Sequence, residues 1–339
     1  MGDHRHMPLS RLQSLGVSLF DGFLEQTVAA SWSSVGFDVR RRLFGWTPAP
    51  DDALDGRTVL VTGPTSGIGR AVSDELAALG ARVILVGRDA ERLAKVRDEL
   101  LNQHGEDRFP TVVADMSSLR SIESAASLIL QTEARLDIII DNAGAIFHAR
   151  EESPDGIECT LATLVVGPFA LISRMLPLLE RSRAARVVAV TSGGMYTQGS
   201  DPDDLETTPD PFDGTRAYAR AKRVQVSLAR EWARRLGATG ITFNAMHPGW
   251  TDTPGLAEAL PWFHRLMGPI LRTPAQGVDT LVWLAAAPEA GHLSGKLFLD
   301  RRPRPFDRVP WTRVSALDRR RLWDRVVALA GVPDPSSEH

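Results

Sequence analysis

The chain has 339 residues, of which 43% are hydrophobic and 24% charged, values typical of a globular protein and unlike those of a disordered or fibrous one. Its net charge is −3 with no long block of one sign, which gives no reason to expect a nucleic acid as partner. The single cysteine, Cys159, excludes an intramolecular disulfide framework and fits a reducing compartment. We see no secretory leader and no apolar run of membrane-spanning length, so we expect a soluble protein of the cytoplasm.

Residues 1–55 form an N-terminal extension that we place outside the main domain. Within residues 10–25, apolar side chains follow one stripe of a helix while polar residues occupy its other side. Three consecutive arginines at 40–42 and the bulky Phe44 and Trp46 come next, before a linker over residues 48–55. Two interpretations stay open: an arm that packs on its own domain or a partner subunit, and an interfacial helix that makes peripheral contact with a membrane.

From residue 57 onward, apolar runs typical of strands alternate with longer helical patterns. The predicted strands are residues 58–62, 82–86, 111–114, 136–140, 186–191 and 241–246, with a weaker one at 297–299. Several of them are continuously apolar, as expected for strands that helices cover on both faces. Single helices between the strands, such as those predicted at 69–79 and 90–101, indicate βαβ units. We therefore predict an α/β fold with a doubly wound parallel sheet, in one domain over residues 56–300.

Residues 301–339 form a C-terminal extension. A helix is predicted to begin at Ser315, because Asp318 stands three residues later at the spacing of a capping box. Leu322, Val326 and Leu329 give this helix an apolar side, so we expect it to pack on the domain.

A glycine-rich turn follows the first predicted strand and opens a helix. Glycines there allow a tight backbone turn, and main-chain N–H groups at the helix N-terminus can bind a pyrophosphate. A glycine-rich turn without a ligand is the alternative. The residues predicted to bind a dinucleotide in this turn are Gly63, Thr65, Ser66, Gly67, Ile68 and Gly69.

The end of the second predicted strand indicates which dinucleotide is bound. An NAD site commonly has Asp or Glu there to bind the ribose 2′-hydroxyl, whereas this chain has Gly87 and then Arg88. A guanidinium suits the 2′-phosphate of NADP, and Asp89 is predicted to cap the next helix instead. The sequence therefore favours NADP(H) over NAD(H).

Further candidates follow the third and fourth predicted strands. Asp115 is placed to accept a hydrogen bond from the adenine amino group, and Asn142, Ala143 and Gly144 form a turn of small residues that lets the backbone approach a ligand. Each is also a common turn former. Ligands bind at the carboxyl ends of parallel strands in such sheets, which favours a role in cofactor binding.

Tyr218 and Lys222 stand four residues apart, on one face of a predicted helix, in a chain with only two tyrosines. A nearby ammonium favours the phenolate of a tyrosine and lowers its pKa, which suits general acid–base catalysis on a carbonyl or alcohol. Ser192, after the fifth strand, is placed to hydrogen-bond the same substrate oxygen. No cluster of histidine, cysteine and carboxylates has metal-ligand spacing, so no metal site is predicted.

In this order, the motifs at 62–69, 142–144, 192, 218–222 and 248–249 resemble those of the short-chain dehydrogenase/reductase family. The resemblance covers about residues 55–300 and implies a Rossmann-type domain of about seven parallel strands, NAD(P)-dependent carbonyl–alcohol chemistry, and homo-oligomers. It implies that Tyr218 is the acid/base, that Lys222 binds the nicotinamide ribose and lowers the pKa of Tyr218, and that Ser192 orients the substrate oxygen. Pro248 and Gly249 would border the nicotinamide. Residues 191–195, 211–215, 246–255 and 294–301 resemble one branch of the family, which also has an N-terminal extension.

One position departs from the family pattern. An asparagine that helps to hold a proton-relay water is expected after the fourth strand, and alignment on Gly167 puts Leu164 at this position. A leucine side chain cannot bind water, and Thr160 and Thr163 are nearby but not at the matched position. Either the relay is rebuilt, or turnover is slow, or the protein binds the cofactor with little catalysis.

The region that corresponds to the family's substrate lid, about residues 250–273, is rich in apolar residues. They are Trp250, Leu256, Leu260, Trp262, Phe263, Leu266, Met267 and Ile270. They predict a small lipophilic carbonyl or alcohol substrate, unless they only pack the lid on the body. The leading hypothesis is thus an NADP(H)-dependent oxidoreductase, and the alternative is a cofactor-binding sensor or scaffold protein with little turnover.

Overall fold

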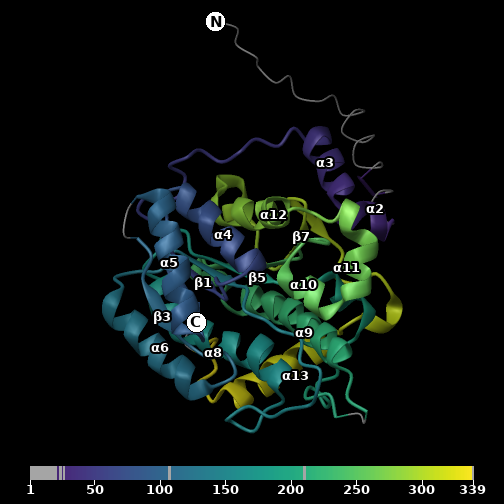
Figure 1. Ribbon diagram of the computed structural model, residues 1–339. Helices are drawn as coiled ribbons and strands as arrows, with labels where there is room; N and C mark the ends of the chain where they lie inside the picture. The colour runs from purple at the N-terminus through teal and green to yellow at the C-terminus, as the bar shows by residue number, and fades with distance from the viewer. Residues whose placement is uncertain (1–20, 23–24, 26, 106–107, 209–210, 338–339) are drawn as a thin grey trace, which may run out of the picture.

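The computed structural model describes residues 21–22, 25, 27–105, 108–208 and 211–337, and it has one mixed sheet with helices on both faces (Figure 1). The strand order is β3-β2-β1-β4-β5-β6-β7-β8. The strands are β1 Thr58–Thr62, β2 Arg82–Gly87, β3 Thr111–Val113, β4 Ile138–Asp141, β5 Arg186–Val190, β6 Thr242–Met246, β7 Leu297–Leu299 and β8 Arg302–Arg304. The chain order reverses between β1 and β4, which is where open α/β sheets bind their ligands.

The first seven strands pair in parallel, so the predicted doubly wound sheet is confirmed. The eighth strand was not predicted: it pairs with β7 in the antiparallel direction after a turn at Asp300 and Arg301. Both turn residues have left-handed backbones, with φ values of 56° and 54°. Arg301 is held there by its N–H bond to Thr280 Oγ1 at 3.1 Å and its ion pair with Asp279.

Two helical layers cover the sheet and divide the core into two main clusters of buried residues. One face carries α4 Gly67–Ala78, α5 Ala90–His104 and α12 Pro274–Ala286. The other carries α6 Leu119–Thr132, α8 Gly167–Leu179 and α9 Gly214–Arg235, with the C-terminal α13 Ala316–Ala330 packed on α8 and α9. The strands β1 and β6 are buried along their whole length, which explains the apolar run Val59–Val61 at the centre of β1.

Capping residues fix the ends of the predicted helices. Asp89 accepts hydrogen bonds from the first N–H groups of α5, and Gly105 ends that helix in a left-handed conformation. Ser315 caps α13: its Oγ accepts from Asp318 N at 3.0 Å and donates to Asp318 Oδ2 at 2.7 Å. The predicted roles of Asp89 and of the Ser315–Asp318 pair as caps are thus confirmed.

A long apolar helix runs through the core as α7 Cys159–Leu161, the π-helical turn η1 Ala162–Val166 and α8. Among the described residues this is the one helix long and apolar enough to cross a membrane by length and composition, so the expectation that no apolar run reaches this length was wrong. Of its most apolar window, 78% is buried inside the fold, as in the core helix of a globular protein. A single π turn within such a helix often marks a functional site.

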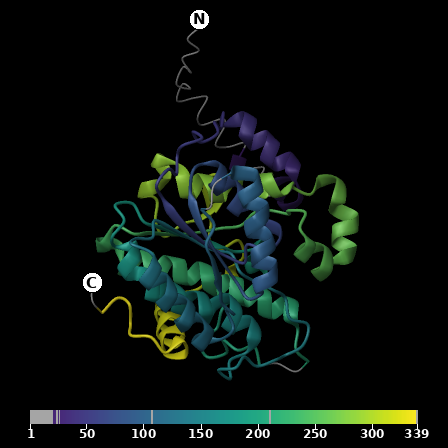
Figure 2. The same ribbon diagram turned by 60° about the vertical axis from the view of Figure 1, so that its left-hand side comes forward.

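The N-terminal extension lies beside the lid. Its described helices are α2 Val28–Trp32 and α3 Ser34–Leu43, and the lid contains α10 Pro254–Ala259 and α11 Pro261–Met267. Figure 2 shows the lid helices (light green) standing out from the body near the purple arm. Trp250 N donates to Trp32 O at 2.8 Å, and Ser34 Oγ donates to Ile270 O at 3.2 Å, so this part of the arm packs on its own chain. The apolar stripe predicted for residues 10–25 falls almost entirely outside the described residues.

Candidate active site

A large cleft of about 2010 Å³ opens at the carboxyl ends of the parallel strands. It is lined by the turns after β1 to β6, the start of α9, the lid and the arm. All residues predicted to act in catalysis or cofactor binding line this one cleft. They are Gly63, Thr65, Ser66, Gly67, Ile68, Gly69, Arg88, Asp115, Asn142, Ala143, Gly144, Ser192, Tyr218, Lys222, Pro248 and Gly249.

The turn after β1 has the geometry that a pyrophosphate needs. Gly63 and Gly67 have φ values of 68° and 51°, which favour glycine. A Cβ at Gly69 would lie 2.0 Å from Gly63 O, so only glycine fits this close approach. Asn142 Nδ2 donates to Thr62 O and Gly63 O, at 3.0 and 3.1 Å, and holds the turn from the neighbouring strand. The cradle at the N-terminus of α4 therefore fits the diphosphate of a dinucleotide.

Two arginines and one aspartate follow β2. Arg88, Asp89 and Arg92 all line the cleft, and the Asp89 carboxylate is engaged as the cap of α5 and in an ion pair with Arg92 at 3.4 Å. The nearest atom to a Cβ placed on Gly87 would be Leu93 Cδ2, at 3.3 Å. This arrangement suits a 2′-phosphate better than a bare ribose hydroxyl.

Asp115 lies at the expected edge of the cleft, but its carboxylate is already bound. Its Oδ1 accepts from Ser117 N at 2.9 Å and from Ser117 Oγ at 2.8 Å, which shapes the turn before α6. The carboxylate can still accept a further hydrogen bond at its second oxygen. Asp115 thus combines the turn-forming role and the cleft position that its sequence context offered as alternatives.

Ser192, Tyr218 and Lys222 converge on the floor of the cleft. Ser192 caps the short 3₁₀ helix η2 Gly193–Thr197, and its Oγ accepts from Gly194 N at 3.2 Å. Lys222 is almost fully buried; its Nζ donates to Val190 O at 2.8 Å and lies 5.6 Å from the centre of the Tyr218 ring. The Lys222 ammonium group, carried by α9, therefore lies at the end of β5.

The pKa of Tyr218 moves in the direction opposite to the prediction. The surrounding protein desolvates the phenol and raises its pKa to about 12, although a hydrogen bond with Ser192 opposes this. Burial lowers the pKa of Lys222 to about 8, and the carboxylate of Asp141 works against that shift. The Tyr218 and Lys222 side chains, in the positions that they have here, therefore do not by themselves produce the predicted lowering of the Tyr218 pKa.

Leu164 lies where the alignment on Gly167 placed it, close to Lys222. It is fully buried in the π turn η1, and a Cβ on Gly144 would meet Leu164 Cδ2 at 2.7 Å and Lys222 Nζ at 3.8 Å. The apolar side chain therefore occupies space beside the lysine. Thr163 lines the cleft, whereas Thr160 is fully buried and its hydroxyl has no hydrogen-bond partner among the residues that the structure describes.

The lid is only partly the apolar wall that was predicted. Trp250, Leu256, Leu260 and Phe263 line the cleft. Trp262 and Leu266 instead face solvent with 67% and 69% of their surface exposed, because α11 turns one side outward, and Met267 and Ile270 do not line the cleft. The prediction that the whole segment lines the substrate site was wrong for these four residues.

The arm contributes a wall that the sequence analysis did not predict. Trp32 lines the cleft beside Ser192: a Cβ on Gly193 would lie 2.2 Å from the Trp32 ring, so glycine is needed for the contact. The ring also packs edge-on against His247 and Trp250, with centroid distances of 5.0 and 6.1 Å. A tryptophan 160 residues upstream of Ser192 gives no local signal of this role.

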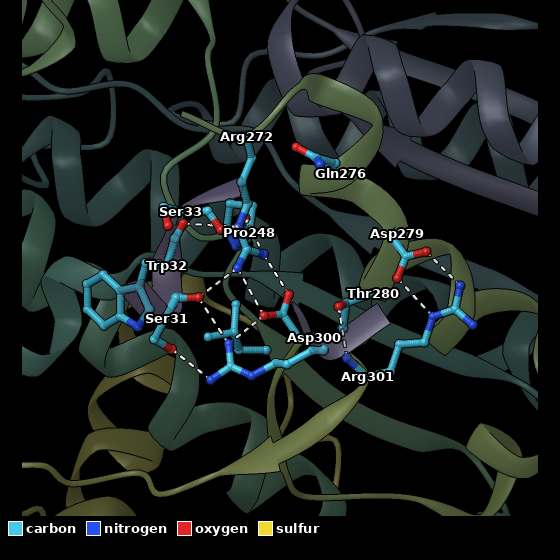
Figure 3. Close-up of polar contacts among 12 residues, drawn as sticks. Ser31, Trp32, Ser33, Pro248, Arg272, Gln276, Asp279, Thr280, Asp300 and Arg301 are labelled. Carbon is cyan, nitrogen blue, oxygen red and sulfur yellow. Dashed lines mark hydrogen bonds and ion pairs between the residues drawn. The ribbon is translucent and has the colours of Figure 1, made fainter. Parts of the chain in front are cut away.

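A buried ion cluster fixes the arm to the sheet (Figure 3). Asp300 accepts from Arg40 at 2.6 Å and from Arg272 at 2.6 and 2.9 Å, and both arginines also donate to Ser31 O. Arg272 Nε donates to Trp32 O at 3.0 Å. The two guanidinium groups hold the pKa of Asp300 below its ordinary value despite burial. In the sequence, the sign that could have indicated this cluster was an aspartate, Asp300, directly after a buried strand.

Comparison with known proteins gives a consistent result. A family model described as short chain dehydrogenase matches residues 57–262. Bovine (Bos taurus) dehydrogenase/reductase SDR family member 12, from the branch that the sequence motifs resemble, is 40% identical over 79% of this chain and 84% of its own length. Mouse (Mus musculus) retinol dehydrogenase 14 is 32% identical over 82% of this chain and 87% of its own. A short chain dehydrogenase from Shigella flexneri, solved in complex with NADP, superposes with a TM-score of 0.63 at 26% identity, covering 75% of this chain and all of its own.

Proposed function

The chain belongs to the short-chain dehydrogenase/reductase family and is an NAD(P)-dependent oxidoreductase acting on alcohol and carbonyl groups, and we propose that it uses NADP(H) on a small lipophilic substrate. The observation that carries this proposal is the meeting of Ser192, Tyr218 and Lys222 in the cleft that also holds the glycine cradle. Ser192 and Tyr218 both line the cleft, and Ser192 lies close enough to Tyr218 to lower its pKa, so one substrate oxygen can contact both hydroxyls.

In this proposal Tyr218 is the acid/base. It donates a proton to the carbonyl oxygen during reduction and takes one from the alcohol during oxidation, while Ser192 orients that oxygen. The nicotinamide, when bound, supplies or accepts the hydride. The Lys222 ammonium would hold the nicotinamide ribose. Its positive charge, 5.6 Å from the centre of the Tyr218 ring, favours the phenolate form.

Preference for NADP(H) rests on Arg88. Its guanidinium lines the cleft at the end of β2, and Asp89, the nearest acid in the sequence, is committed to the cap of α5. The solved relative from Shigella flexneri carries NADP. Its cofactor and this arginine together support the choice.

A lipophilic substrate is supported by the inward faces of the lid. Trp250, Leu256, Leu260 and Phe263 give this end of the cleft an apolar wall, which favours an apolar ligand. The name of the relative retinol dehydrogenase 14 indicates an alcohol of that character for that protein.

The decisive experiment replaces Tyr218 by Phe. We expect at least about a hundredfold loss of kcat on any carbonyl that a broad panel identifies, with the Kd for NADPH changed less than twofold, because only the acid/base proton is removed. Kcat comes from NADPH absorbance and Kd from calorimetry. The other tyrosine supplies the control: Tyr196→Phe removes a hydrogen bond to Pro305 O but leaves the acid/base in place.

The alternative function, a cofactor-binding sensor or scaffold, is favoured by Leu164 beside Lys222. If the wild type turns over nothing in the panel and Tyr218→Phe changes no measurable property, this alternative replaces the proposed one. A large rise in turnover in Leu164→Asn would instead show that a relay was missing.

Partners and location complete the proposal. We infer a cytoplasmic homo-oligomer, with peripheral membrane contact through the apolar stripe of residues 10–25. Light scattering of the purified protein measures the oligomer, and sedimentation with phosphatidylserine vesicles measures the contact. A monomer that stays in the supernatant would contradict both.

A further inference from the structure

A buried polar pair lies one helical turn from Lys222 and lines an internal cavity rather than the cleft. Asp141 ends β4, and Gln225 stands one turn after Lys222 on α9. Gln225 Nε2 donates to Asp141 Oδ2 at 3.1 Å, and each side chain is only 4% exposed. Carboxylates are rarely buried this deeply without a cation in direct contact. The pair therefore needs an explanation beyond packing.

Both side chains have an unused oxygen. Among the described residues, Asp141 Oδ1 and Gln225 Oε1 have no hydrogen-bond partner, although both are buried. The two residues line an internal cavity of about 30 Å³ whose other walls are buried side chains, Leu164, Ala189 and Phe243 among them. A cavity of about 10–15 Å³ already holds one water, and a water needs polar partners of this kind. One water donating to both oxygens would satisfy them.

This cavity adjoins the side chain that departs from the family pattern. Leu164 is one wall of it and also lies close to Gly144 and Lys222. The side chain of Leu164 is an apolar neighbour of the lysine. The Asp141 carboxylate, which lines the same cavity as Leu164, acts on Lys222 through its charge.

We propose that Asp141 and Gln225 hold a water in this cavity and act together as positioning residues for Lys222, in place of the support that Leu164 cannot give. This proposal rests on the proposed function of Tyr218 and Lys222. Asp141 touches neither substrate nor cofactor in this account. It acts by keeping the lysine charged and in place.

The electrostatics agree with this arrangement. Burial raises the pKa of Asp141 to about 6 and lowers that of Lys222 to about 8, and each charge opposes the shift of the other. Among the described residues, the charged group that acts on Asp141 is Lys222 from α9. The residues of η1 and β5 that line the cavity with Asp141, such as Leu164 and Val187, are apolar. Near neutral pH the pair is thus ionised as carboxylate and ammonium.

The test is Asp141→Asn, which keeps the shape and removes the charge. We expect kcat at pH 7.5 to fall about tenfold, the acid limb of the kcat profile near pH 6 to disappear, and the alkaline limb to move about one pH unit lower, because Lys222 loses its proton more readily. Loss of a carboxylate with a purely structural role would instead lower Tm and leave the pH profile unshifted.

The matched control is Asp137→Asn, at the residue directly before β4. Asp137 is buried and pairs with Arg57 at 2.9 Å, so this variant loses stability but keeps the wild-type pH profile. Profiles of Asp141→Asn that superpose on the wild type, or a loss of Tm with an unshifted profile, would overturn the proposal.

A second readout does not depend on turnover. The chain has three lysines, so protein labelled with ¹⁵N at lysine Nζ gives few side-chain signals, and Lys222→Arg identifies the one of Lys222. Its apparent pKa should fall by about one unit in Asp141→Asn and by less in Gln225→Leu. An unchanged value contradicts the proposal even if no substrate is found, while failure of the Tyr218 experiment alone leaves this titration interpretable.

Discussion

The two sides of the cleft are built in different ways. The cofactor side consists of backbone turns that each follow one strand, with Gly63, Gly69 and Asn142 in contact over short distances. The substrate side is assembled from distant segments: Trp32 from the arm meets the lid, and Asp300 from the sheet edge holds the arm in place. The first side depends on glycine geometry and the second on buried charge. Substitutions should therefore act on them separately.

The largest effect should come from Asp300→Asn, which leaves the buried Arg40 and Arg272 without their shared anion. We expect a loss of about 3–5 kcal/mol in the free energy of unfolding at pH 7. Because the folded-state pKa of Asp300 is lowered, its contribution is present above its unfolded pKa of about 3.9 and is lost as the pH falls through the folded value. The difference between variant and wild type should therefore shrink in acid.

Denaturant unfolding at several pH values measures this difference. Asp279→Asn is the control, since Asp279 pairs with Arg301 at 2.6 Å nearer the surface and should cost about 1 kcal/mol or less. Equal losses for the two aspartates would mean that the buried cluster is no more important than a surface pair.

The same difference explains what could be predicted from the sequence. The cofactor turn, the strand ends and the Tyr218–Lys222 pair are local patterns, so their place in one cleft followed from the strand order. The contact between Trp32 and Gly193 joins residues far apart in the chain, and Arg272 and Asp300 have the residue types of an ordinary surface. Nothing in a single sequence marks which charges become buried together. The eighth strand was missed for a related reason, since its three residues are two arginines and a proline.

Arg88→Ala tests the cofactor side and should have the next largest effect. We expect the Kd for NADPH to rise about 10- to 100-fold and that for NADH to change little, because only the 2′-phosphate loses its guanidinium. Calorimetric titration with both nucleotides measures this. Lys95→Ala removes one exposed charge from α5 outside the cleft lining and should leave both affinities unchanged. Equal losses of NADPH and NADH affinity in Arg88→Ala would contradict the assignment of NADP(H).

Trp32→Leu tests the substrate side and should have the smallest of these effects. We expect the KM of the best carbonyl in the panel to rise about five- to tenfold, with kcat and the Kd for NADPH nearly unchanged, because the wall beside Ser192 loses its ring but the catalytic groups stay. Trp46→Leu is the control on the same arm: Trp46 packs on Phe37 and Arg301 and does not line the cleft. Both variants loosen the arm, so a rise in KM shared by both would come from arm packing in general. A rise confined to Trp32→Leu would instead identify this ring as part of the substrate site, and thereby make the N-terminal arm a component of the active site.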